Sequence, residues 1–393
     1  MKEIDTTHCA TGIPGLYIHI PFCRKICPFC SFAVLKDNPA RHPTYLNLLH
    51  EEYNLLSRQF QLDLTPCESI YLGGGTPSRL STFELEQLVD WLFSIIKISK
   101  KIQWSIEVNP EDISPKYASD LKALGFTRIS LGIQSFQQTD LEKLKRVHSG
   151  AQSRFALESV IDAGFEDYSL DFMFGFPGQT KEQLEKDIEL ALSYHPSHIS
   201  VYSLSIEPKT ALNRKPVWKD WIRENENLIS DLYRLIVERL TAANFVHYEV
   251  SNFCIDGYQS RQNMIYWNRR NYLGLGLGAH SFVSPYRWGN MKRWIDYKSS
   301  LTLKSLPHIS FEALSETMHR DEEVMLSLRL NQGLDLALFK KKYLLDFPDS
   351  WSKKVEAYFQ HNLLVEKGNI LQLTTKGLLI ADEITASLCA CLP

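Results

Sequence analysis

Short apolar runs and longer amphipathic segments alternate along the first half of the chain. Between about residues 15 and 205, the apolar runs have strand length, and the segments between them repeat apolar residues at helical spacing. The alternation predicts an α/β fold with parallel strands joined by right-handed crossovers. The predicted strands are Leu16–Ile20, Ser69–Leu72, Gln103–Val108, Arg128–Ile133, Tyr168–Phe172 and His198–Leu204. The predicted helices are Tyr45–Arg58, Phe83–Ile96, Pro115–Leu124, Gln152–Ala163 and Lys181–Leu192.

The number of predicted strand–helix units limits the possible architectures. About six strand–helix units are too few for a closed eight-fold barrel but fit an open, partial one. A doubly wound sheet is the alternative that the pattern leaves open. In both architectures the functional face lies at the C-terminal ends of the strands.

The strand–helix alternation ends at about residue 291. Before that point, a helix is predicted over Asn225–Leu240, and glycines alternate through 274–278. Those glycines indicate either a strand packed closely against a flat neighbour or a bulged barrel edge. We therefore expect a first domain over residues 1–290 and a small α+β, winged-helix-like domain over 291–393. The elements predicted in the second domain are helices at His319–Arg329, Leu336–Tyr343, Trp351–His361 and Leu378–Leu388, and a hairpin of Leu363–Lys367 with Ile370–Leu373.

Composition limits the classes of protein that remain. With 44% hydrophobic and 23% charged residues, the 393-residue chain can bury an ordinary globular core. A formal net charge of −3 gives no basic face for nucleic acid. No apolar run reaches the roughly 18–20 residues of a membrane span, and residues 1–15 lack the pattern of a signal peptide. We expect a cytoplasmic protein, with peripheral association at a membrane as an alternative.

Three cysteines follow the first predicted strand directly. Cys23, Cys27 and Cys30 lie within eight residues, too close together to pair easily as disulfides. A structural zinc site normally takes four protein ligands, and no second cysteine pair lies nearby. Iron–sulfur clusters are also held by clustered thiolates, and three of them leave one iron open to another ligand. The spacing favours such a cluster, with zinc or a purely structural role as alternatives.

Polar residues and glycines gather where the predicted strands end. Gly73, Gly74 and Gly75 follow the second strand and can bring backbone N–H groups close to a ligand. Glu107 ends the third strand, and further polar residues follow at the fourth and fifth. A solvated loop explains each polar residue alone, whereas together they predict a polar ligand pocket.

These motifs resemble one known superfamily. The C-x3-C-x2-C spacing resembles the signature of the radical S-adenosylmethionine (SAM) superfamily, and YIHIPFC resembles its coproporphyrinogen oxidase branch. The segments GGGTP, SIEVNP, RISLGIQSF and LDFMFGFPGQT extend the resemblance over most of the first domain. It implies a partial (β/α)6 barrel and a [4Fe-4S] cluster held by Cys23, Cys27 and Cys30. SAM would chelate the open iron and be cleaved reductively to a 5′-deoxyadenosyl radical.

The resemblance also assigns cofactor contacts residue by residue. It implies that a cluster-bound SAM contacts Tyr17, Phe29, Gly74 and Glu107. It implies that a second SAM contacts Gly75, Thr76, Gln134, Arg146, Asp171 and Ser205.

A further segment resembles the haem-handling HemW branch of this family. That branch usually carries His-Asn-x-x-Tyr-Trp, a motif tied to haem binding, and its YLGLGLGAH segment is matched around His280. Here the first motif position is Gln262, a poor iron ligand, while Asn263, Tyr266 and Trp267 remain. The resemblance therefore implies haem contacts at Asn263, Tyr266, Trp267 and His280. Either His280 or His247 replaces the missing imidazole, or the affinity for haem is weaker.

Two functions from different classes follow. The first is a haem chaperone that binds the cluster, SAM and haem and delivers haem to an acceptor protein, for example one of a respiratory complex. The second is an oxygen-independent coproporphyrinogen III oxidase, which would decarboxylate two propionates. Such oxidases usually carry a fourth cysteine where this chain has Phe32, and a longer arm than the sixteen residues before Tyr17. Both features favour the chaperone, which would also need an electron donor for its cluster, and no catalytic residue is assigned.

Overall fold

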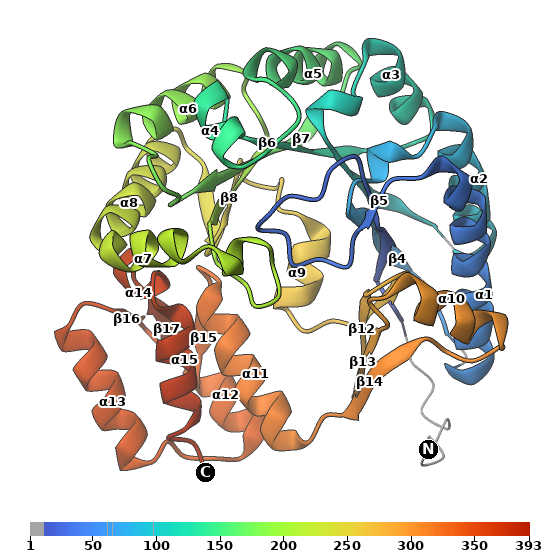
Figure 1. Cartoon of the computed structure of the whole chain (residues 1–393). Helices are drawn as coiled ribbons and strands as arrows, with labels where there is room; N and C mark the ends of the chain where they lie inside the picture. Colours follow the sequence, from blue (N-terminus) through green and yellow to red (C-terminus); the bar gives the residue numbers. More distant parts are fainter. Residues whose placement is uncertain (1–11, 61, 65, 97) are drawn as a thin grey trace.

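The chain forms a large curved sheet with helices on its outer face, followed by a smaller domain (Figure 1). This computed structural model describes residues 12–60, 62–64, 66–96 and 98–393, so most of the N-terminal segment discussed above lies outside it. The large sheet has twelve strands in the order β14-β13-β12-β11-β1-β4-β5-β6-β7-β8-β10-β9.

Six consecutive parallel strands form the centre of this sheet. Each strand pairs in parallel with the next one, which is the arrangement expected of consecutive β–α–β units. The partial (β/α)6 barrel is thereby confirmed, and each predicted strand is present with ends shifted by a few residues. The strands are β1 (Gly15–Ile20), β4 (Cys67–Gly74), β5 (Ile98–Val108), β6 (Arg128–Gln134), β7 (Asp167–Phe174) and β8 (His198–Ser203).

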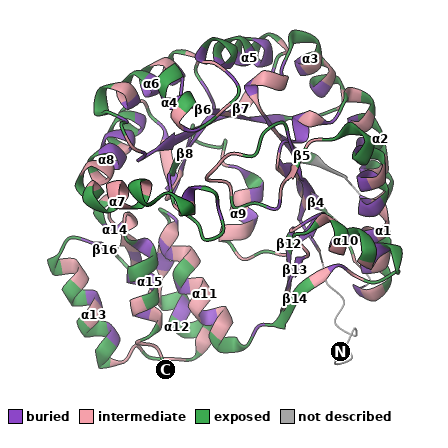
Figure 2. Ribbon diagram, in the orientation of Figure 1, coloured by how far each residue is buried: buried purple, intermediate pink, exposed green. Residues whose placement is uncertain are grey.

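The helices begin where the sequence supplies caps. Ser81, Ser149 and Thr180 each form a capping box with the residue three positions on. Apolar helix faces pack against the strands, and the helices turn exposed residues outward, as the green outer faces in Figure 2 show. The outer helices are α1 (His42–Phe60), α2 (Thr82–Ile95), α3 (Pro115–Ala123), α5 (Gly150–Asp162), α6 (Lys181–Ser193) and α8 (Glu226–Ala242).

Both ends of the parallel sheet are extended. The glycine-rich segment forms β11 (Tyr272–Leu275), which pairs in parallel with β1. A Cβ at Gly274 would lie 2.1 Å from the His280 carbonyl oxygen, so this strand is packed closely against its neighbour, one of the two alternatives expected. The antiparallel additions are β12 (His280–Val283), β13 (Tyr286–Asn290) and β14 (His308–Ala313) at one end, and β10 (Asn252–Cys254) and β9 (Val246–Glu249) at the other.

Residues 291–313 pack with the large sheet. Helix α10 (Trp294–Thr302) places Tyr297 and Leu301 in the main hydrophobic core, and β14 pairs with β13. The second core begins only at Val324. We expected the division after residue 290, and on this packing we propose to place it after β14 instead.

The C-terminal domain combines helices with a small antiparallel sheet, as predicted. Its core includes Val324, Phe339 and Trp351. The last predicted helix is interrupted at Ile380 and forms two shorter helices. The elements are α11 (Glu316–Arg329), β15 (Leu334–Asp335), α12 (Leu336–Tyr343), α13 (Asp349–Gln360), β16 (Leu364–Lys367), β17 (Ile370–Leu373), α14 (Thr375–Leu378) and α15 (Ala381–Cys389).

Several short helices beside the barrel were not predicted, among them α9 (Arg261–Trp267) and α7 (Pro216–Glu224). Helix α9 closes the barrel at the N-terminal ends of the strands, where its Ile265 and Gln262 lie against Gly15 (Figure 1). Helix α7 follows β8. Each is too short for a periodic apolar pattern to show reliably.

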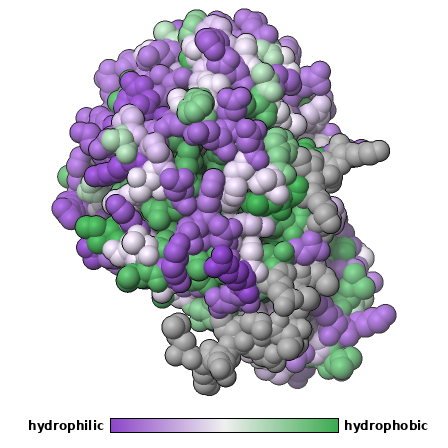
Figure 3. All heavy atoms as spheres, turned by 90° about the vertical axis from the view of Figure 1, so that its right-hand side faces the viewer, coloured by the Kyte–Doolittle hydropathy of each residue, from purple (hydrophilic) through white to green (hydrophobic). Residues whose placement is uncertain are grey.

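None of the helices among the described residues is long and apolar enough to cross a membrane. The face seen in Figure 3 carries hydrophilic side chains over most of its upper part, with hydrophobic ones between them.

Candidate functional site: a cysteine loop over a polar cavity

The three cysteines lie in a loop that is fixed at its base. The loop leaves β2 (Phe22–Cys23) and returns through β3 (Leu35–Lys36), and the two short strands pair in parallel. Within it, the Cys30 N–H donates to the Cys27 carbonyl at 3.1 Å, which turns the chain back on itself. The loop is also held to the segment after β8, because the Leu212 N–H donates to the Pro28 carbonyl at 2.8 Å. The backbone therefore holds the three thiols near the C-terminal end of β1.

A buried histidine anchors the far end of this loop. His19 Nε2 lies 2.9 Å from the Ala33 carbonyl oxygen and therefore carries the proton, which leaves Nδ1 to accept from the Tyr17 hydroxyl at 3.0 Å. Burial lowers the pKa of His19 to about 4, so the ring stays neutral at ordinary pH. His19 thus joins β1 to the cysteine loop.

The glycines at the end of β4 are required by close packing. A Cβ at Gly74, where φ is +112°, would lie 2.4 Å from the His19 ring, and one at Gly75 would lie 2.6 Å from the Pro21 backbone. A Cβ at Gly73 would lie 2.9 Å from a Glu107 carboxylate oxygen. The glycines allow β4, the cysteine loop and Glu107 to meet around one space.

That space is a cavity of about 410 Å³ at the C-terminal ends of the strands. Its volume lies within the roughly 300–1,000 Å³ of small-molecule sites. Twelve of the thirteen residues expected to hold the cluster and SAM line it: Cys23, Cys27, Phe29, Cys30, Gly74, Gly75, Thr76, Glu107, Gln134, Arg146, Asp171 and Ser205.

Three carboxylates line this cavity, and two of them, Glu107 and Asp171, come from its central strands. Glu107 accepts hydrogen bonds from the Tyr71 hydroxyl and the Gly74 N–H, each at 2.9 Å. Asp171 accepts from Ser130 at 2.8 Å and from Ser169 at 3.0 Å. Burial raises the pKa of Glu107 to about 7, helped by the charge of Asp171, and burial raises the pKa of Asp171 as well. The pair forms an acidic wall suited to a cationic ligand.

The thiols are contacted by neighbouring polar side chains. The Thr76 hydroxyl donates to Cys23 Sγ at 3.6 Å, and Arg146 Nη1 donates to Cys27 Sγ at 3.4 Å. Burial raises the pKa of Cys23 to about 12 and also raises that of Cys30. These two thiols are therefore protonated in the metal-free protein, and a bound metal centre would have to displace their protons.

Among the described residues, no three His, Cys, Asp or Glu side chains are placed so that they could hold a single metal ion. A cubane cluster binds each of its thiolates to a different iron, so its ligands do not converge on one point. The lack of such a convergence point among the described residues is therefore compatible with the expected cluster.

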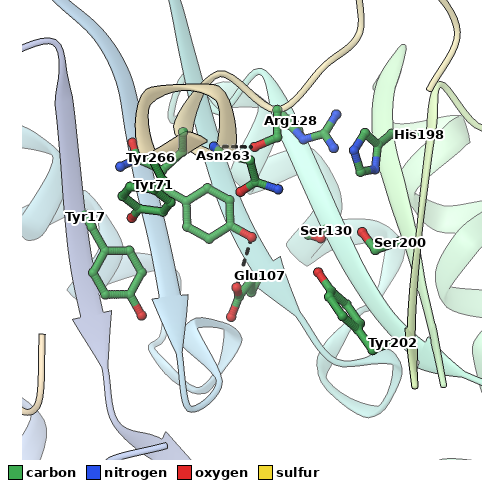
Figure 4. A pocket seen from close by; sticks show the side chains of 12 residues that line it. Tyr17, Tyr71, Glu107, Arg128, Ser130, His198, Ser200, Tyr202, Asn263 and Tyr266 are labelled. Carbon is green, nitrogen blue, oxygen red and sulfur yellow. Dashed lines mark hydrogen bonds between the residues drawn. The ribbon is translucent and has the colours of Figure 1, made fainter. Parts of the chain in front are cut away.

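Tyr17 lies apart from the other expected contacts. Its ring lines a second, inner chamber of about 270 Å³ below the cavity (Figure 4). The two spaces share Tyr71, Glu107, Ser130 and Tyr202 in their walls. Tyr17 therefore does not line the expected SAM cavity, and the shared wall that includes Tyr71 and Glu107 lies between them.

The expected haem contacts are divided among different places. Asn263 and Tyr266 of α9 face the inner chamber, as Figure 4 shows. Trp267, the next residue, lines a cleft of about 710 Å³ between the barrel and the C-terminal domain. His280 is exposed on β12, beside Gly289. These side chains are not gathered in one cavity.

The possible replacements for the motif histidine are equally separate. Gln262 is 1% exposed, and neither amide atom has a hydrogen-bond partner of good geometry, although the amide lies near the Tyr266 hydroxyl. His247 stacks on Phe253, and burial lowers its pKa to about 4. Neither His247 nor His280 lines the inner chamber that Gln262 lines.

Several residues of the two spaces were missed in the sequence. Arg128 and Ser130 of β6, and His198 and Ser200 of β8, line the inner chamber. Asn109, the residue after β5, lines the upper cavity. Arg128 and Ser130 stand at every second position with Gln134, and Asn109 does so with Glu107, and side chains at every second position of a strand share a face. Alternation continued from Gln134 and Glu107 would have found these three, whereas no expected residue on β8 pointed to His198 and Ser200.

A glycine-lined, acidic cavity lies under a three-cysteine loop at the C-terminal ends of a partial barrel, the arrangement that the resemblance to the radical SAM superfamily implied. Residues 17–191 match the family model described as "Radical SAM superfamily", and residues 314–380 match that of the HemN C-terminal domain.

Similar proteins identify the family within this superfamily. A "Heme chaperone HemW" of Bacillus subtilis is 33% identical over 94% of this chain and 97% of its own. One of Mycobacterium tuberculosis is 33% identical over 95% of this chain and 94% of its own. The chain belongs to the HemW haem-chaperone family within the radical SAM superfamily.

A solved structure supports the fold. The coproporphyrinogen III oxidase HemN of Escherichia coli superposes with a TM-score of 0.79 and covers 96% of this chain and 90% of its own. At 22% identity, this likeness concerns the fold alone.

Proposed function

We propose that the protein is a cytoplasmic haem chaperone that carries a [4Fe-4S] cluster and SAM and delivers haem to acceptor proteins. The observation that supports this most strongly is the full-length match to relatives named for that activity, combined with an intact cysteine loop. Acceptors would be haem-requiring proteins such as those of respiratory complexes, and the cluster would need an electron donor.

The residues of the upper cavity fit a cluster and SAM. Cys23, Cys27 and Cys30 are free and would hold three irons. When bound, such a cluster supplies an electron to the sulfonium group of SAM. Glu107 would accept a hydrogen bond from the SAM amino group, and the Phe29 ring would cover the adenine. Phe29 is held for this role by its packing against an apolar cluster that includes Met173 and Leu204.

The residues expected to contact haem do not form a single site. The inner chamber behind Asn263 and Tyr266, at about 270 Å³, lies below the roughly 300–1,000 Å³ of drug-sized ligand sites, and haem is a large ligand. Trp267 and His280 lie elsewhere. We therefore assign no axial ligand.

Replacing Glu107 by Gln should weaken SAM binding. The amide can keep both neighbours, accepting from the Gly74 N–H and donating to the Tyr71 oxygen, but it loses the charge. A hydrogen bond to a charged group contributes about 1.5–3 kcal/mol, so the dissociation constant should rise about 10- to 100-fold. Calorimetric titration of reconstituted protein with SAM measures it. Glu207→Gln, at the same cavity, is the matched control, and equal losses in both variants would contradict the role of Glu107.

The affinity for SAM should also depend on pH. Because the pKa of Glu107 is raised to about 7, the carboxyl group is neutral below that value and negative above it. The SAM amino group gains a charged hydrogen-bond partner only at higher pH, so affinity should fall as pH is lowered from about 8 to 6. Titrations across this range should show a steeper fall in the native protein than in Glu107→Gln. The same slope in both would place the titrating group elsewhere.

Haem binding tests the chaperone proposal directly. Added haem should shift its Soret band on binding and saturate at a fixed stoichiometry, because ligation changes the iron environment. Absorption titration measures this. A spectrum that stays that of free haem at all ratios would contradict the proposal.

A further inference from the structure

Two of the three loop thiols are joined by an unbroken row of hydrogen bonds. At one end, Thr76 donates to Cys23 Sγ at 3.6 Å, and at the other, Arg146 donates to Cys27 Sγ at 3.4 Å. Asn109 connects them. Its Nδ2 donates to Thr76 Oγ1 at 3.1 Å, and its Oδ1 accepts from Arg146 Nη2 at 2.6 Å.

The donors and acceptors in this row are compatible with only one orientation. Arginine can only donate, so the Asn109 oxygen must face Arg146 and its NH2 group must face Thr76. The Thr76 oxygen then accepts from Asn109, and its one proton is directed to Cys23. The orientation of the Asn109 amide thus determines which way the Thr76 hydroxyl points.

Asn109 is itself held in place. Its backbone N–H donates to Ser78 Oγ at 3.2 Å, just after β5. Across from it, Gly132 leaves room for the amide, since a Cβ there would lie 3.1 Å from Asn109 Oδ1. Arg146 is fixed by a second bond, to the Gly132 carbonyl at 3.3 Å. The row is built from three separate strand ends, those of β4, β5 and β6, and from the segment after α4 (Gln138–Lys143).

We propose that Asn109 is a positioning residue that fixes the hydrogen bonds to the Cys23 and Cys27 thiolates and thereby sets the reduction potential of the cluster. The proposal rests on the cluster proposed above. Hydrogen bonds to cluster sulfurs, and nearby charge, are among the factors that set such potentials. Donors stabilise the more negative, reduced state, so losing them should lower the potential.

Substitutions at the two uncharged members separate this role from a structural one. In Asn109→Asp, the carboxylate would accept from both Arg146 and Thr76, which turns the Thr76 proton away from Cys23 and adds a negative charge. In Thr76→Val, the donor to Cys23 is absent. Thr76→Ser keeps the hydroxyl and is the matched control. The midpoint potential of the reconstituted cluster, followed by EPR during anaerobic redox titration, is the measurement.

We expect the potential to fall in Thr76→Val, to fall further in Asn109→Asp, and to match the native value in Thr76→Ser. Native potentials in both Asn109→Asp and Thr76→Val would overturn the role of Asn109 while leaving the cluster standing. If Asn109→Asp cannot be loaded, Asn109→Leu decides, because it removes both amide contacts without adding charge: a lowered potential supports the proposal and a native one overturns it. A native protein that takes up no cluster would overturn the proposed function together with this role.

Discussion

Replacing any one of Cys23, Cys27 or Cys30 by Ala is expected to abolish the iron–sulfur cluster almost completely. The resemblance gives the cluster three protein thiolates, and the described chain holds these three thiols in one loop at the mouth of the cavity. Two remaining thiolates would leave two irons without protein ligands. Iron and sulfide content after anaerobic reconstitution, together with EPR of the reduced protein, measures the loss.

The matched control for this prediction is Cys391→Ala. Cys391 is a free, half-buried cysteine that packs with the core of the C-terminal domain. Its loss should leave the iron content unchanged. A full cluster in any of the three loop variants would mean a different ligand set, and a colourless native protein that takes up zinc would refute the cluster altogether.

Replacing Glu52 by Ala should destabilise the barrel by about 3–5 kcal/mol. Glu52 of α1 is fully buried and accepts from the Gly276 N–H at 2.9 Å, Asn290 Nδ2 at 2.5 Å and the Tyr297 hydroxyl at 2.6 Å. Each buried donor left without a partner costs about 1–3 kcal/mol. The free energy of unfolding from denaturant titration measures the change.

Tyr297→Phe is the graded comparison for Glu52→Ala. It removes one donor and leaves Glu52 bonded to Gly276 and Asn290, so its cost should be nearer 1 kcal/mol. Equal costs for the two variants would show that Glu52 does not connect α1 to the β11–β13 extension. Burial raises the pKa of Glu52 to about 7, because little water reaches this carboxyl group.

The parallel core could be predicted because its signal is local. Each strand from β1 to β8 in that core is a short apolar run, and most of the intervening helices have their caps in the sequence, as at Ser81 and Thr180. The strand-end rule then directed attention to Glu107 and Asp171, and both face the cavity. For these two residues, the local pattern and the family motif gave the same prediction.

The remaining features depend on contacts between distant parts of the chain. Arg146 meets Cys27 across 119 positions, and Asn109 meets Arg146 across 37. Tyr17 was expected in the SAM site, but it stands early in β1, so its ring faces the inner chamber rather than the upper cavity. The closure of the barrel by α9 also follows from tertiary packing rather than from periodicity.

The haem motif shows the same limitation. Its residues share one short helix, yet adjacent positions face different spaces, with Tyr266 toward the inner chamber and Trp267 toward the cleft between the domains. Residues that are close together in a sequence motif suggest a single binding site. In a helix, however, adjacent residues point in different directions, so the motif residues face different spaces.

One anaerobic assay tests the central claim most directly. Reconstituted protein with SAM and a reductant is supplied with coproporphyrinogen III in one sample and haem in another, and both porphyrin products and the haem spectrum are followed. The chaperone proposal predicts a shifted Soret band with haem and no protoporphyrinogen from coproporphyrinogen III. Sustained formation of protoporphyrinogen with release of CO2 would contradict it and identify an oxidase.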